Sequence, residues 1–194
     1  MRLPVLFLVT SALLCPPCRA QAPVFKVTPI QSSIRCNTRS ASPIAGNFSK
    51  WNATLTFTSR DAETGALDFE IQAASIQTGS QTKDDALKSK DFLDVEQNPV
   101  ISFKTTSSVQ TSKTTFDLSG TFTLRGISKP ATLNIVIADQ GFGTGYVQGT
   151  MSFNREDYGM TGKAPLKIAD SVEIDLNFKA VQVSGPKVAY KQFH

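Results

Sequence analysis

The sequence predicts an all-β protein: an eight-stranded antiparallel β-barrel with one short helix covering an end. Apolar and polar residues alternate through most of the chain, which is the period of half-buried strands. Short polar or glycine-bearing turns, such as "DAETG" and "DQGFG", separate consecutive segments, so sequence neighbours are expected to pair as hairpins. The segments 66–76, 114–124 and 144–155 exceed the usual strand length of about five or six residues. A sandwich is the alternative, and the long strands favour the barrel.

The first residues differ from the rest of the chain. Residues 1–20, "MRLPVLFLVTSALLCPPCRA", combine Arg2 with an apolar run, two prolines and a final Ala20, as in a secretory signal peptide cleaved after that alanine. Lipidation of Cys15 or Cys18 is the weaker alternative, because neither cysteine follows a small residue. We therefore expect a single mature domain, residues 21–194, that is periplasmic or secreted.

Charge and residue chemistry argue against several classes of function. Cleavage would remove Arg2 and Arg19, which leaves 18 basic against 16 acidic residues and lowers the net charge from +4 to +2. This surplus is too small for a nucleic-acid-binding surface. Cys36 would be the sole thiol, and the only histidine is the last residue, His194, so the usual zinc sites and histidine-based nucleophile pairs have no components. We expect no metal, no cofactor and no enzymatic activity.

The predicted strands follow one another along the mature chain. The pattern Ile34, Cys36 and Thr38 places the thiol in an early strand, where a buried structural role is expected. Clear alternation begins at residues 51–58, where an apolar residue occupies every second position from Trp51. It recurs in the segments 67–73, 101–103, 116–124, 133–137, 147–153 and 172–178.

One segment departs from the alternation and predicts the helix. Residues 82–99, "TKDDALKSKDFLDVEQNP", begin with a threonine and acidic residues and continue through Ala86 and Leu87 to a basic turn. Negative charge near the start and positive charge near the end suit the helix dipole. We expect this short helix to cover one end of the sheet.

Phenylalanine dominates the face expected to point inward. Gly120 and Gly149 interrupt this face, and we expect them to leave space that a sandwich core would fill. A barrel of about eight strands can hold one small ligand. The predicted lining residues are Phe57, Phe69, Phe103, Phe122, Met151 and Phe153.

Several stretches of the chain resemble one family of proteins. "LKSKDFLDVEQNPVISF", "LSGTFTLRGISKP" and "GTMSFNREDYGM" occur in the order and spacing of the YceI-like proteins, which are lipocalin-like polyisoprenoid binders. The resemblance covers about residues 24–183. It implies an exported bacterial barrel whose apolar interior is a tunnel for a long isoprenoid chain.

The implied function is non-enzymatic binding, sequestration or transport of an isoprenoid lipid with a polyprenyl chain and a phosphate or quinone head. Transient contact with a membrane or membrane protein is expected, and the protein would be a monomer or homodimer. One alternative is an interaction module for a membrane partner with no stable ligand. The other is a lipid-modifying enzyme with Glu156 or Asp157 as acid and base.

Arg155 raises a separate question, because it is the next residue on the strand face of Gly149, Met151 and Phe153. A guanidinium at the end of an apolar face has two explanations. It could brace the barrel rim by pairing with an acid such as Asp157 or Asp91. It could instead bind the phosphate of a lipid head group, for which its planar fork is suited.

Overall fold

The computed structural model describes residues 21–38, 43–139, 143–161 and 169–193. The expected signal segment, 1–20, lies outside the described residues, as does most of the expected "DQGFG" turn. One helix is present in the described part, α1 (Gln81–Lys88), together with three short 3-10 turns, η1 (Ala62–Thr64), η2 (Ala73–Ser75) and η3 (Arg155–Tyr158). The strands are β1 (Val24–Thr38), β2 (Ala45–Phe48), β3 (Trp51–Phe57), β4 (Gly65–Gln72), β5 (Ile76–Gln77), β6 (Val100–Gln110), β7 (Thr115–Leu124), β8 (Ile127–Asp139), β9 (Thr144–Asn154) and β10 (Ser171–Ser184).

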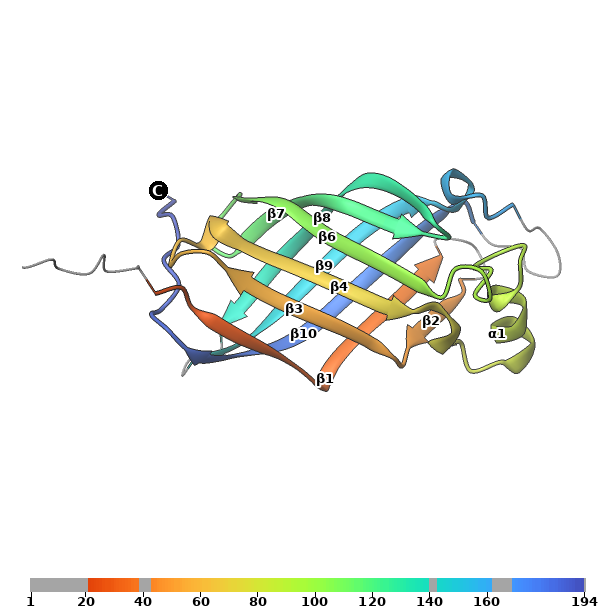
Figure 1. The fold of residues 1–194 in the computed structure, drawn as a ribbon, viewed down its shortest axis with the longest axis horizontal. Helices are drawn as coiled ribbons and strands as arrows, with labels where there is room; N and C mark the ends of the chain where they lie inside the picture. The colour runs from red at the N-terminus through yellow and green to blue at the C-terminus, as the bar shows by residue number, and fades with distance from the viewer. Residues whose placement is uncertain (1–20, 39–42, 140–142, 162–168, 194) are drawn as a thin grey trace, which may run out of the picture.

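The strands form a single curled sheet in the order β3-β4-β6-β7-β8-β9-β10-β1-β2-β5, with antiparallel ladders between the named strands (Figure 1). The predicted all-β class and antiparallel pairing are confirmed. The expected count of eight strands is not confirmed, because the described residues form a sheet of ten. The two additional strands, β2 and β5, span four and two residues, which is too short for an alternation pattern to reveal.

Strand β1 bends sharply in its middle, as Figure 1 shows. Its register against β10 shifts between Thr28 and Ser33, and Gln31 has a φ of 65°. The hydroxyl of Ser32 donates to the carbonyl oxygen of Thr28 at 2.5 Å and accepts from the backbone N–H of Lys179 at 2.8 Å. This bulge redirects the strand, so that β1 also packs against β3 and the sheet curls back on itself.

Helix α1 lies at one end of the curled sheet, as predicted (Figure 1). It is shorter than the predicted segment, because Ser89 ends it and turns follow as far as the start of β6. The carboxylate of Asp84 accepts from the Thr78 backbone N–H at 2.8 Å and from its hydroxyl at 2.6 Å. These bonds fix the helix to the preceding loop, and Leu87 is buried in the core.

The middle of the sheet's interior is closely packed. The rings of Phe69 and Phe103 stack with centroids 5.7 Å apart, and both side chains are almost fully buried. A Cβ added at Gly120 would lie 2.6 Å from the Phe103 ring, and one added at Gly149 would lie 3.1 Å from Leu133. The expectation that these glycines leave empty space is therefore wrong, because neighbouring side chains occupy the room that a missing Cβ provides.

Candidate ligand-binding site

An apolar cavity of about 220 Å³ lies inside the sheet at the end away from α1, where the C-terminal residues pass. We call it the tail-end cavity. Most of its lining comes from the strands β3, β4, β7, β8, β9 and β10. Its larger apolar side chains include Phe25, Leu55, Phe57, Phe116, Leu118 and Ile135. Such a space suits the chain of an apolar ligand.

The C-terminal strap, which we define as residues 186–193, borders the tail-end cavity. Three of its residues, Lys187, Val188 and Tyr190, line the cavity. Ala189 anchors the strap, because its N–H donates to the carbonyl oxygen of Arg60 at 2.7 Å and its carbonyl accepts from the N–H of Ala62 at 2.9 Å. The strap therefore forms one wall of the cavity.

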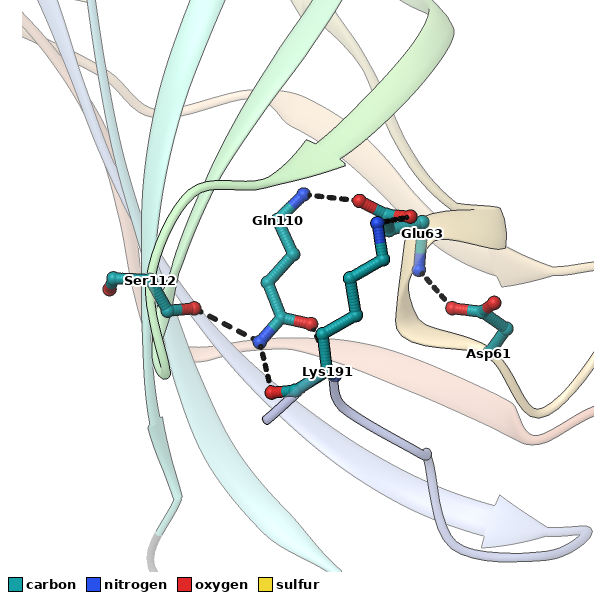
Figure 2. Close-up of polar contacts among 5 residues, drawn as sticks. All are labelled: Asp61, Glu63, Gln110, Ser112 and Lys191. Carbon is teal, nitrogen blue, oxygen red and sulfur yellow. Dashed lines mark hydrogen bonds and ion pairs between the residues drawn. The ribbon is translucent and has the colours of Figure 1, made fainter. Parts of the chain in front are cut away.

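A polar cluster at Lys191 also holds the strap (Figure 2). Its ammonium pairs with a carboxylate oxygen of Glu63 at 2.5 Å, and its backbone N–H donates to the side-chain oxygen of Gln110 at 2.7 Å. The Gln110 amide group donates back to the Lys191 carbonyl at 3.3 Å, while its backbone N–H donates to Glu63 at 2.9 Å. The Lys191 side chain and this N–H lower the pKa of Glu63.

A second, smaller cavity of about 60 Å³ lies at the other end, beneath α1 and the loop that follows it. We call it the helix-end cavity. Its lining includes Phe48, Leu87, Phe92, Phe122, Phe153 and Ile174. The rings of Phe122, Phe153 and Tyr158 contact one another at centroid distances of 5.2 to 5.6 Å. These aromatic contacts leave little free volume at this end.

The structure divides the predicted lining residues between different places. Phe57 lines the tail-end cavity, whereas Phe122 and Phe153 line the helix-end cavity. Phe69, Phe103 and Met151 are buried and line neither of these two cavities. The residues expected to line one tunnel thus border two separate cavities or lie buried in the packed interior.

Arg155 begins η3 at the α1 end of the molecule, and its side chain is only 5% exposed. One terminal nitrogen lies 2.8 Å from a carboxylate oxygen of Asp170, and the other donates to the carbonyl of Met160. The expected acid Asp157 pairs instead with Lys129 at 3.2 Å. These contacts support the rim-bracing explanation with Asp170 as the acid. Arg155 lines the helix-end cavity and does not line the tail-end cavity.

Sequence reasoning missed most of the tail-end lining. Leu118, Ile135 and Val147 were recognisable as inward-facing from their alternation, but alternation does not show which positions border an open end. The strap was missed because its only local signal is the alternation of Val188 and Tyr190. Several of its contacts join residues more than a hundred positions apart, as in the pair between Glu63 and Lys191.

Cys36 is the free cysteine of the described residues. Burial raises the pKa of the Cys36 thiol to about 11, which agrees with the predicted structural role. Within the described ranges, no group of three or more His, Cys, Asp or Glu side chains could hold a metal ion. No helix among the same residues is long and apolar enough to cross a membrane.

A family model described as a YceI-like domain matches residues 25–180. The chain belongs to the YceI-like family. A protein named "UPF0312 protein" from Pseudomonas savastanoi pv. phaseolicola is 30% identical to this YceI-like protein over 145 residues, which are 72% of this chain and 74% of the relative. The predicted family is confirmed.

Solved structures share the fold of this YceI-like protein. Burkholderia cenocepacia BcnA superposes with a TM-score of 0.73 at 23% identity, covering 79% of this chain and 99% of that one. A polyisoprenoid-binding domain from Saccharophagus degradans, implicated in plant cell wall breakdown, gives a TM-score of 0.64 at 12% identity, with 82% and 99% covered. At these identities the likeness concerns the fold.

Proposed function

We propose that this YceI-like protein binds the chain of an isoprenoid lipid in the tail-end cavity and sequesters or carries it without chemical change. The observation that carries the proposal is the cavity itself, an apolar space of about 220 Å³ inside the curled sheet. Burial of a hydrocarbon chain there would be driven by roughly 25 cal/mol for each Å² of apolar surface removed from water.

The likeness to a polyisoprenoid-binding domain supports this class of ligand through the shared fold. The cavity's chemistry supports it independently. Aliphatic and aromatic side chains dominate the lining, and no acidic side chain belongs to it among the described residues. A branched hydrocarbon chain needs no hydrogen-bonding partner, so such a lining suits it.

The size of the cavity limits how much of the ligand it holds. Its volume of about 220 Å³ is below the range of about 300–1,000 Å³ typical of small-molecule pockets. The packed rings of Phe69 and Phe103 lie beyond the lining. The bound segment is therefore a short stretch of chain, and the rest of a long polyprenyl lipid lies outside the cavity.

We also propose that the protein works outside the cytoplasm, where it meets membrane lipids transiently. Residues 1–20 support this because their pattern is that of a cleaved secretory signal. N-terminal sequencing of the protein from its host is expected to find a mature chain starting at Gln21. A chain that starts with a lipid-modified Cys15 or Cys18 would overturn this part of the proposal.

Lipid extraction tests the main proposal. Protein purified under native conditions from its own host is expected to release a prenyl lipid detectable by mass spectrometry. The variant Ala180→Phe adds a ring to the cavity wall and should lose that lipid. The matched control Val136→Phe changes a residue that is 43% exposed on β8 and should retain it. A folded wild-type protein without any lipid would contradict the proposal.

A further inference from the structure

The tail-end cavity has a single charged residue in its described lining, and that residue is a cation. Lys187 belongs to the wall of the cavity and is also exposed to solvent. Among the described residues, ion pairs form at Lys129, Arg155 and Lys191, and none forms at Lys187. The cavity therefore combines an apolar interior with one ammonium group, that of Lys187, which has no acidic partner among the described residues.

The backbone on both sides of Lys187 is held in place. Before it, the side-chain amide group of Gln182 donates to the carbonyl oxygens of Pro186 at 2.7 Å and Gly185 at 3.0 Å. After it, Ala189 forms its two backbone hydrogen bonds with residues 60 and 62. Lys187 is thus fixed between two anchors beside the cavity, which limits the region that its ammonium can reach.

The acidic residues near the strap already have other partners. Glu63 pairs with Lys191 at 2.5 Å, and a carboxylate oxygen of Asp61 accepts from the Glu63 backbone N–H at 2.9 Å. The charge of Lys187 is therefore available to a ligand. An ammonium next to an apolar cavity matches an amphiphile whose chain is buried and whose head is an anion.

We propose that Lys187 binds the phosphate head group of the lipid whose chain occupies the tail-end cavity. This inference rests on the proposed function and assigns the head group its site. It differs from the head-group role considered for Arg155, whose guanidinium lies at the opposite end and is paired with Asp170. The ligand class that follows is a prenyl phosphate rather than a neutral prenyl lipid.

Calorimetric titrations with farnesyl phosphate, farnesol and inorganic phosphate test this inference on the wild type and two variants. Lys187→Met should weaken the affinity for farnesyl phosphate by about 10-fold or more, the lower end of the loss of a charged hydrogen bond. Its affinity for farnesol should not change. Lys113→Met is the matched control, because Lys113 is exposed in the β6–β7 turn and does not line the cavity; it should bind both lipids as the wild type does.

The outcomes separate this inference from the proposed function. An equal loss of farnesyl phosphate affinity in both variants would overturn the assignment to Lys187, since only long-range attraction would then be at work. Unchanged affinity of Lys187→Met for farnesyl phosphate would also overturn the assignment to Lys187. If farnesol still binds in that case, the proposed function stands. Inorganic phosphate that binds as tightly as farnesyl phosphate would show a site for free phosphate and overturn the lipid head group. If neither lipid binds the wild type, the proposed function itself fails.

Discussion

Glycines at two positions show how the absence of a single Cβ shapes the interior. Gly120 lies against the Phe103 ring and the Lys104 carbonyl oxygen, and an added Cβ would be 2.6 Å and 2.4 Å from them. At Gly149 the nearest atoms are side-chain methyl groups of Leu133, Leu176 and Ile135 at 3.1 to 3.3 Å. Flexible side chains can shift by a few tenths of an ångström, whereas a backbone carbonyl within a ladder cannot do so easily.

Gly120→Ala is therefore expected to lower the free energy of unfolding by about 1–3 kcal/mol, the usual cost of overpacking. Gly149→Ala is the matched control and should cost less. Denaturant titration of both variants measures the difference. A larger loss for Gly149→Ala would mean that the packing described around Phe103 is wrong.

Arg155 gives a second residue-scale prediction, in which stability and binding are separated. Arg155→Met removes the partner of Asp170 and of the Met160 carbonyl, so we expect a loss of about 1–3 kcal/mol in the free energy of unfolding. Lys129→Met breaks a more exposed pair with Asp157 and should cost under about 1 kcal/mol. The affinities for farnesyl phosphate and farnesol should be unchanged in Arg155→Met. A loss of affinity for farnesyl phosphate alone would show that Arg155 binds the head group.

At the scale of elements, local patterns predicted the long strands well. The alternation at 51–58 became β3 (Trp51–Phe57), and the segment 114–124 became β7 (Thr115–Leu124), because a two-residue period is a local property of the chain. The bend of β1 was not predictable in this way. It depends on the left-handed conformation of Gln31 and on the hydrogen bond from Lys179 to Ser32, which joins residues far apart in the sequence.

The C-terminal strap provides a prediction about pH. The pKa of Glu63 is lowered in the folded protein, first by its hydrogen bond with the Lys191 side chain and then by the Gln110 N–H. A depressed folded-state pKa contributes stability that is fully present above the ordinary value of 4.5 and is lost as the pH falls through the folded-state value. Acid should therefore release the strap at Lys191.

The comparison of the wild type with Glu63→Gln isolates this contribution, because all other titrating groups are common to both proteins. The wild type should be the more stable of the two at neutral pH, and the gap should close as the pH falls below 4.5. Lys191→Met should remove most of the same pH dependence. Denaturant titration across this range checks it, and a gap that stays constant with pH would mean that the Glu63–Lys191 pair does not stabilise the strap.

At the scale of the whole molecule, the candidate site was only partly predictable. Alternation indicated which residues face inward. Of the residues predicted in this way, Phe57, Phe122 and Phe153 border cavities. The position of the open space was not predictable, since it depends on how rings from different strands meet, as in the stack of Phe69 on Phe103. The family resemblance suggested the proposed ligand class, but the two cavities and the strap depend on tertiary contacts that the sequence does not show.

The central claim is that a prenyl chain occupies the tail-end cavity and not the helix-end cavity. Methyl-resolved NMR during titration with farnesol tests it directly, because each cavity has its own reporters. Methyl groups of Leu118, Ile135 and Val147 line the first cavity, and those of Leu87, Ile101 and Ile174 line the second. The claim predicts saturable shifts concentrated in the first set. Shifts confined to the second set, or none in either set, would contradict it.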